Sequence, residues 1–224
     1  MAEKGKRQRS DAAPNPAVGA GKAPPGLYLV ATPIGHLGDI TLRALETLAG
    51  CDVIACEDTR VTRKLADRYG IATPLTPYHE HNAAEARPQL LARLARGEAV
   101  ALVSDAGTPL ISDPGYKLVR AAHAAGVPVT ALPGASAILT ALVLSGLPTD
   151  RFLFAGFLDS HRERRRRELT ALKTVPASLV FFESPHRIAD ALADMHDLLG
   201  DREAAVGREL TKRFEELRRD RLAA

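Results

Sequence analysis

From Leu27 onward, short apolar runs alternate with longer amphipathic stretches, and no other feature constrains the fold of this chain as much. Strands are predicted at the runs LYLVA, DVIAC, AVALVS and VPVTAL. Helices are predicted between and after them, at about residues 41–48, 61–69, 83–96, 116–125 and 136–144. This alternation is typical of an α/β fold in which helices cover both faces of a parallel sheet. In such folds, ligands bind at the carboxyl ends of the strands.

A second α/β unit follows the first. The segment 146–150 contains Gly, Pro and Asp, which interrupt both the strand and the helix periodicity of the apolar residues. We therefore expect a linker there, between an N-terminal domain at 26–146 and a C-terminal domain at 147–224. The second domain is predicted to contain strands at FLFAGF, SLVFFE and EAAVGREL, helices at about 160–172 and 185–199, and a final helix over 211–224. Because no strand follows that last helix, the C-terminal domain is predicted to be smaller and incomplete.

Composition excludes several classes of protein. No run approaches the roughly 20 apolar residues of a membrane span, so we expect a cytoplasmic protein with no membrane contact. The net charge of +3 is small, so only the placement of basic residues can indicate a polyanionic partner. Residues 1–25 combine basic residues with Ala, Pro and Gly and are predicted to be a disordered basic leader. Cys51 and Cys56 lie in an apolar run, which favours buried or half-buried thiols over a metal site or disulfide.

Three loops rich in small residues each follow a predicted strand, at residues 32–38, 104–115 and 132–137. Loops that follow parallel strands emerge at one edge of the sheet, so we expect the three to form one pocket. They contain no Walker lysine and offer Asp, Ser, Thr and backbone groups, which favours a neutral or cationic ligand over a triphosphate. The alternative for each loop is a purely structural turn.

The motifs in and around these loops make the chain recognisable. They are LYLVATPIGHLGDITLRALETL, CEDTRVTRKL, YHEHN, SDAGTPLISDPGYKLV, LPGASAILTAL, SGLPTDRFLFAGFL, FFESPHRI and GRELTK. With them the chain resembles the tetrapyrrole methylase superfamily, and within it the ribosomal RNA small subunit methyltransferase I family. The resemblance implies a two-domain α/β fold, a homodimer, and S-adenosylmethionine bound between the domains. The implied reaction is 2′-O-methylation of a cytidine in the decoding region of 16S ribosomal RNA, within the small ribosomal subunit.

The same resemblance implies a set of cofactor-binding residues. In this chain they are Pro33, Ile34, Gly35, Gly107, Thr108, Ile111, Ser136 and Ala137. Asp105 lies beside them, where it faces the cofactor's polar groups, orients the loop, or closes the loop through an Asx-type turn.

A ribose hydroxyl is a poor nucleophile at neutral pH, so a general base or a stabilising cation should assist the transfer. The candidate bases are Glu57, Asp58, His79, Glu80 and Glu183. The sequence does not choose among them. Glu57 and Asp58 could instead be acidic residues at the start of a helix, and Glu183 could instead be the buried ion-pair partner of Arg187. The YHEHN motif lacks a third ligand at metal spacing, so no metal site is expected.

The RNA-facing surface is predicted from an arginine run in one helix, at Arg164, Arg165, Arg166 and Arg167. Clustered guanidinium groups suit phosphates, and Arg187 is a further candidate to grip one. The alternative is a solvated helix face whose arginines pair with acidic neighbours.

After Lys212, the residues RFEELRRDRLAA are expected to leave the family pattern, which suggests a shortened copy with an exposed sheet edge. Two alternative functions follow from these observations. One is a methylase of a corrin or porphyrin precursor, and the other is a non-catalytic RNA-binding protein with an incomplete cofactor site.

Overall fold

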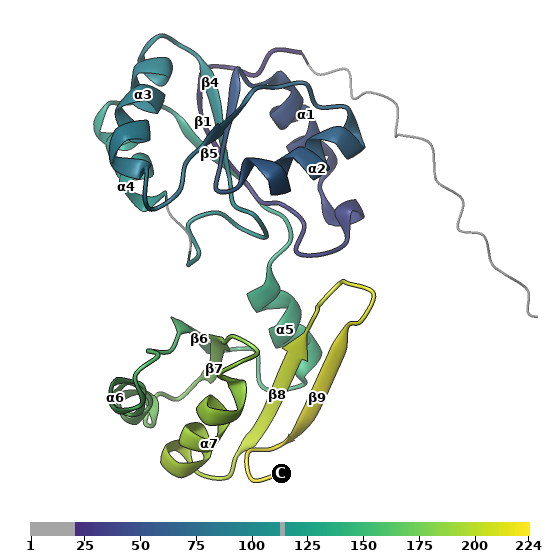
Figure 1. The fold of residues 1–224 in the computed structure, drawn as a ribbon, viewed down its shortest axis with the longest axis vertical. Coiled ribbons are helices and arrows are strands. Elements are labelled where there is room, and N and C mark those ends of the chain that lie inside the picture. The colour runs from purple at the N-terminus through teal and green to yellow at the C-terminus, as the bar shows by residue number, and fades with distance from the viewer. Residues whose placement is uncertain (1–20, 113–114) are drawn as a thin grey trace, which may run out of the picture. The chain divides into compact units, whose positions relative to one another are not determined.

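The computed structural model describes residues 21–112 and 115–224, and the chain divides into two compact units (Figure 1). The described part of the first unit comprises residues 21–30, 41–105 and 116–132, and that of the second comprises 31–40, 106–112, 115 and 133–224. Most of the predicted basic leader at 1–25 lies outside the described residues. The division is less simple than one linker at 146–150, because two loops from the first half of the chain group with the second unit.

The first unit is built on five parallel strands in the order β3-β2-β4-β1-β5. The strands are β1 (Gly26–Val30), β2 (Val53–Cys56), β3 (Leu75–Pro77), β4 (Ala99–Val103) and β5 (Val129–Leu132). The predicted parallel sheet is confirmed. Every residue of β2 and β4 is buried, which explains why these two strands are continuous apolar runs without alternation. The sequence did not predict β3, which has three residues and ends in proline.

Helices cover both faces of this sheet. They are α1 (Leu42–Gly50), α2 (Thr59–Tyr69), α3 (Ala83–Ala95) and α4 (Tyr116–Ala124). Figure 1 shows α1 and α2 on one face and α3 and α4 on the other. Helix α1 begins where the Thr41 hydroxyl accepts the backbone N–H of Ala44, and α2 ends at Gly70 in the left-handed region, at φ +66°. No helix within the described ranges is long and apolar enough to cross a membrane.

The cysteines are buried free thiols, as their apolar surroundings predict. Burial, together with the neighbouring Asp52, raises the pKa of Cys51 to about 12. Burial also raises the pKa of Cys56. Both side chains therefore stay protonated at neutral pH and contribute to the core of the first unit.

The second unit contains two separate pairs of strands among its described residues. Its elements are the 3-10 helix η1 (Leu37–Asp39), α5 (Ala137–Ser145), β6 (Phe152–Phe157), α6 (Arg162–Leu172), β7 (Ser178–Phe182), α7 (Ile188–Leu199), β8 (Glu203–Arg208) and β9 (Glu216–Arg221). Strands β6 and β7 are parallel, whereas β8 and β9 are antiparallel. A small core of Leu158, Leu169, Met195 and Leu199 joins α6 and α7 to this unit.

The prediction of a helix over 211–224 is wrong, because this segment forms β9. Six residue pairs join it to β8, from Glu203 opposite Arg221 to Arg208 opposite Glu216. The chain reverses through Glu209 and Thr211, which adopt positive φ angles of 52° and 63°. The segment has little strand propensity of its own, so the ladder with β8 determines its conformation.

Candidate active site

The three predicted loops follow the neighbouring strands β4, β1 and β5, and they contact one another within the second unit. Thr32 and Gly107 exchange two backbone hydrogen bonds, each 2.9 Å long, which join the first loop to the second. The Thr108 hydroxyl donates to the carbonyl of Ala135 at 3.5 Å, which joins the second loop to the third. Contacts between residues 75 and 27 positions apart along the chain thus join the loops into one cluster, as the topology predicted.

Close packing explains the glycines of this cluster. A Cβ atom on Gly35 would lie 2.5 Å from Cγ of Lys212 and 2.7 Å from the Thr211 hydroxyl oxygen. Gly107 has a φ of +79°, which side chains rarely tolerate, and a Cβ there would lie 3.4 Å from Cγ2 of Ile34. Gly134 is equally restricted, because its Cβ would lie 2.9 Å from Cβ of Ala31. The cluster therefore leaves little room for added side chains.

A cavity of about 860 Å³ lies in the second unit, lined by residues of α5, β7, α7 and β8. Ile34 of the first loop and Ala137 of the third also line it. Its walls are mostly apolar, and its volume falls within the range of about 300–1,000 Å³ that is usual for small-molecule sites. Two of the predicted cofactor residues thus face a cavity large enough for a nucleoside-sized ligand.

The other predicted cofactor residues lie around the cluster rather than in the cavity wall. Pro33 is buried, and Ile111 is 43% exposed. Ser136 begins α5, where its hydroxyl accepts the backbone N–H of Leu139 at 3.4 Å. Asp105 belongs to the first unit, where its carboxylate accepts the backbone N–H of Asp58 at 3.0 Å. That contact orients the turn before α2.

Asp58 is occupied as the N-cap of α2. Its carboxylate accepts the backbone N–H of Arg60 at 2.8 Å and lies 2.6 Å from that residue's guanidinium. The Arg60 guanidinium holds the pKa of Asp58 at about 2, with the backbone hydrogen bond as the next cause. Glu57, the preceding residue, is half-buried just after β2. Asp58 is therefore a weak proton acceptor at neutral pH.

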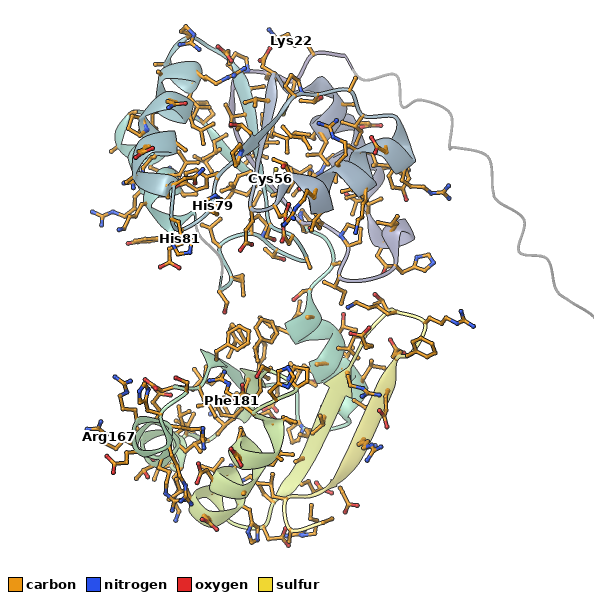
Figure 2. All side chains as sticks on the ribbon, in the orientation of Figure 1. Lys22, Cys56, His79, His81, Arg167 and Phe181 are labelled. Atoms are coloured by element: carbon orange, nitrogen blue, oxygen red, sulfur yellow. The ribbon has the colours of Figure 1, made fainter. Side chains whose placement is uncertain are left out.

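The YHEHN motif follows β3. The backbone N–H of His79 donates to Asn82 at 2.8 Å, and Nδ1 of His79 is buried without a hydrogen-bond partner among the described residues. The rings of His79 and His81 lie edge to face with centroids 6.1 Å apart (Figure 2). Glu80 is exposed. Within the described parts of the chain, no three His, Cys, Asp or Glu side chains are grouped so as to hold a metal.

Glu183 lies just after β7 and lines the cavity. Its side chain is only 4% exposed, and Oε1 accepts the Arg187 guanidinium at 2.6 Å and the backbone N–H of Ser184 at 2.7 Å. Oε2 is buried and has no hydrogen-bond partner in the described structure. Arg187 also donates to the carbonyl of Leu158 at 3.3 Å, so this guanidinium holds Glu183 in place. A buried carboxylate oxygen without a partner is costly, which makes Oε2 a candidate functional atom.

The arginine run of α6 is largely paired within the protein. Asp194 on α7 is 1% exposed and accepts guanidinium nitrogens of Arg165 at 2.7 Å, Arg166 at 2.6 Å and Arg162 at 3.3 Å. Arg165 is itself buried, at 4% exposure. Sequence reasoning missed Asp194. The only signal for it is a pair of carboxylates, Asp194 and Asp197, three residues apart on one helix.

The remaining two arginines of the run are more open. Arg164 has a side chain that is 52% exposed and lies 3.0 Å from the carboxylate of Asp159. Arg167 is exposed, and Figure 2 shows its side chain pointing away from α6. It forms no ion pair with any residue that the structure describes. Its guanidinium is therefore the most available cation of the run.

Sequence comparisons agree with this geometry. The family model for tetrapyrrole (corrin/porphyrin) methylases matches residues 26–224. The chain is 62% identical over 201 residues to "Ribosomal RNA small subunit methyltransferase I" of Mesorhizobium japonicum, covering 89% of this chain and 68% of the relative. It is 52% identical over 196 residues to the protein of the same name from Halalkalibacterium halodurans, covering 88% and 68%. The expectation that the residues after Lys212 leave the family pattern is wrong, because the model match continues to residue 224.

Solved structures share the fold at lower identity. A uroporphyrin-III-C-methyltransferase from Thermus thermophilus has a TM-score of 0.63 at 22% identity, covering 88% of this chain and 85% of that one. Diphthine synthase has a TM-score of 0.69 at 21% identity, covering 88% and 82%. A further uroporphyrin-III C-methyltransferase structure, complexed with S-adenosylhomocysteine, has a TM-score of 0.62 at 23% identity, covering 88% of each chain. These likenesses confirm the predicted two-domain α/β fold class.

Proposed function

We propose, from the premise that this chain belongs to the tetrapyrrole (corrin/porphyrin) methylase family, that it transfers a methyl group from S-adenosylmethionine to ribosomal RNA. The target we propose is the 2′-oxygen of a cytidine in the decoding region of 16S ribosomal RNA, in the small subunit. The observation that carries the proposal is the cavity lined by Ile34, Ala137 and Glu183, whose Oε2 is buried without a hydrogen-bond partner among the described residues. A corrin or porphyrin substrate is less well supported, because the porphyrin methyltransferases share only the fold whereas the ribosomal RNA enzymes share half or more of their residues.

The residues of the loop cluster fit the cofactor. Ile34 and Ala137 present apolar surface to the cavity, which suits the flat adenine ring. When bound, S-adenosylmethionine supplies an electrophilic methyl group on a positively charged sulfur. The chain's main task is then to hold the ribose hydroxyl in line with that methyl group and to exclude water.

Among the five candidate bases, we propose Glu183. With the cofactor bound, its Oε2 would take the proton that the ribose 2′-hydroxyl loses when its oxygen is methylated. Arg187 and the N–H of Ser184 keep Oε1 occupied, whereas Oε2 is buried and has no hydrogen-bond partner among the described residues. His79 also has a buried nitrogen without a hydrogen-bond partner among the described residues, but His79 does not line this cavity.

We propose that the exposed arginines of α6, Arg164 and Arg167, contact RNA phosphates, while Arg165 holds the helix in place through Asp194. Arg187 then acts on Glu183 more than on RNA. We also propose that the protein works in the cytoplasm as a homodimer, in keeping with a ribosomal substrate and with its family.

The test is transfer of radiolabelled methyl from S-adenosylmethionine to small subunits that lack the modification, followed by nuclease mapping. A labelled 2′-O-methylcytidine in the decoding region is the expected result. Absence of transfer, together with no heat of cofactor binding in calorimetry, would favour the non-catalytic RNA-binding alternative. Glu183→Gln keeps the shape and removes the base, so single-turnover transfer should slow by about 10²–10⁴-fold with cofactor affinity retained. A rate near wild type would exclude Glu183 as the base.

A further inference from the structure

The turn between β8 and β9 presents an aromatic side chain to solvent. This hairpin tip, residues 209–215, carries Phe214, whose exposed fraction is 70%. The guanidinium carbon of Arg213 lies 5.4 Å from the centroid of the Phe214 ring. A single exposed ring is common on protein surfaces, so its neighbours and its place in the fold decide whether it can bind a partner.

The hairpin tip is closely connected to the first loop of the candidate active site. The backbone N–H of His36 donates to the Thr211 hydroxyl at 3.1 Å. The side chain of Lys212 packs so closely on Gly35 that a Cβ there would lie 2.5 Å from it. Phe214 is thus carried by a turn that touches the loop to which we assign the methyl donor.

Internal hydrogen bonds make the hairpin tip a defined platform. Glu215 accepts the backbone N–H of Thr211 at 2.6 Å, and the N–H of Lys212 donates to the carbonyl of Glu209 at 2.9 Å. The Lys212 ammonium is also paired with the Glu209 carboxylate at 3.1 Å. Arg213, by contrast, forms no ion pair with the residues that the structure describes. The tip therefore combines an ordered turn, a solvent-facing ring and one available guanidinium.

An exposed ring beside an arginine matches the chemistry of single-stranded RNA. Unpaired bases stack on aromatic side chains and guanidinium planes, while the cation also attracts the phosphates. We propose that the hairpin tip is an RNA contact, in which Phe214 stacks on an unpaired base near the target ribose and Arg213 binds the adjoining phosphate. This inference rests on the proposed function, since it concerns the same substrate and places a contact for it.

The test uses the absence of tryptophan from the chain. Phe214→Trp places a single indole at the hairpin tip, and its emission should be quenched on titration with a single-stranded decoding-region RNA. Phe152→Trp is the matched control, because that ring is 42% exposed at the start of β6, and its emission should not change. The same RNA in duplex form should quench Phe214→Trp weakly, because its bases are already stacked.

Affinity measurements complete the test. Phe214→Ala should weaken RNA binding by about 5- to 150-fold, the range expected for the loss of one base stack, and leave cofactor affinity unchanged. Phe214→Tyr should restore binding, because a phenol ring also stacks. The inference is overturned if RNA leaves the indole emission of Phe214→Trp unchanged, or if quenching follows protein concentration without RNA, which would indicate contact with a second copy. Quenching by RNA in a protein that transfers no methyl group would support the hairpin contact and remove the proposed activity.

Discussion

Replacing Asp194 with alanine should destabilise the protein strongly. The change removes a carboxylate whose side chain is 2% exposed and leaves the guanidinium of Arg165, 5% exposed, without its partner. Removing one member of a buried ion pair typically costs about 3–5 kcal/mol, because the remaining charge stays out of water. For a chain of this length each kcal/mol lowers the melting temperature by about 2–4 °C, so the loss should be about 6–20 °C. Thermal unfolding followed by circular dichroism measures this shift.

Two further variants test whether the buried ion pair is the cause of this loss of stability. Asp197→Ala is the matched control, because that carboxylate is 51% exposed and, among the described residues, pairs only with Arg166, at 3.0 Å, so its loss should cost less than about 1 kcal/mol. The double substitution Arg165→Met with Asp194→Leu replaces the buried pair with apolar groups, and most of the lost stability should return. If Asp194→Ala costs no more than Asp197→Ala, the buried pair does not anchor α6 to α7 and the reasoning is wrong.

Three more outcomes follow from the structure. Gly35→Ala should weaken cofactor binding in calorimetry, because a Cβ there would lie 3.0 Å from the backbone carbonyl oxygen of Leu210 and closer still to two side chains. Unchanged affinity would show that the packing of the hairpin tip on Gly35 does not affect the cofactor site. Cys51, with a pKa of about 12, should react with a thiol reagent at pH 8 only after unfolding, and labelling of the native protein would contradict its burial. The lowered pKa values of Asp58, at about 2, and Asp194 mean that folding favours their ionised forms, so this stability is complete above about pH 4 and falls as the pH drops toward 2. Urea midpoints that stay constant between pH 5 and pH 2.5 would contradict that assignment.

Most of the first unit follows from hydrophobic pattern alone. The runs that became β2 and β4 are apolar at every position, and a run of only four or five such residues fits a strand buried on both faces. Strand β3 lacks that signal, since it is a short edge strand ending in proline and exists through its pairing with β2. The same reason explains β9, whose charged sequence pairs with β8 despite its helical appearance.

The candidate site was less predictable than the sheet. Topology places the loops after β4, β1 and β5 together, so their contacts could be expected from sequence. The roles of individual carboxylates could not, because they depend on partners brought by the fold. Asp58 and Glu183 both follow strands, yet the first is saturated by Arg60 and the second retains an open buried oxygen. No local pattern distinguishes the two.

The arginine run of α6 offers less positive charge to RNA than its sequence suggests, because most of its guanidinium groups are paired within the protein. Two carboxylates of α7, Asp194 and Asp197, form ion pairs with Arg162, Arg165 and Arg166. These three cations and two anions together carry a net charge of only +1. The counterion release that drives RNA binding depends on cations that can reach phosphates, and most of this set cannot do so without leaving Asp194. The salt dependence of RNA binding should therefore respond to Arg167→Ala and barely to Arg166→Ala. The cations that remain for RNA must come partly from other elements, and Arg213 at the hairpin tip is one that the fold leaves available.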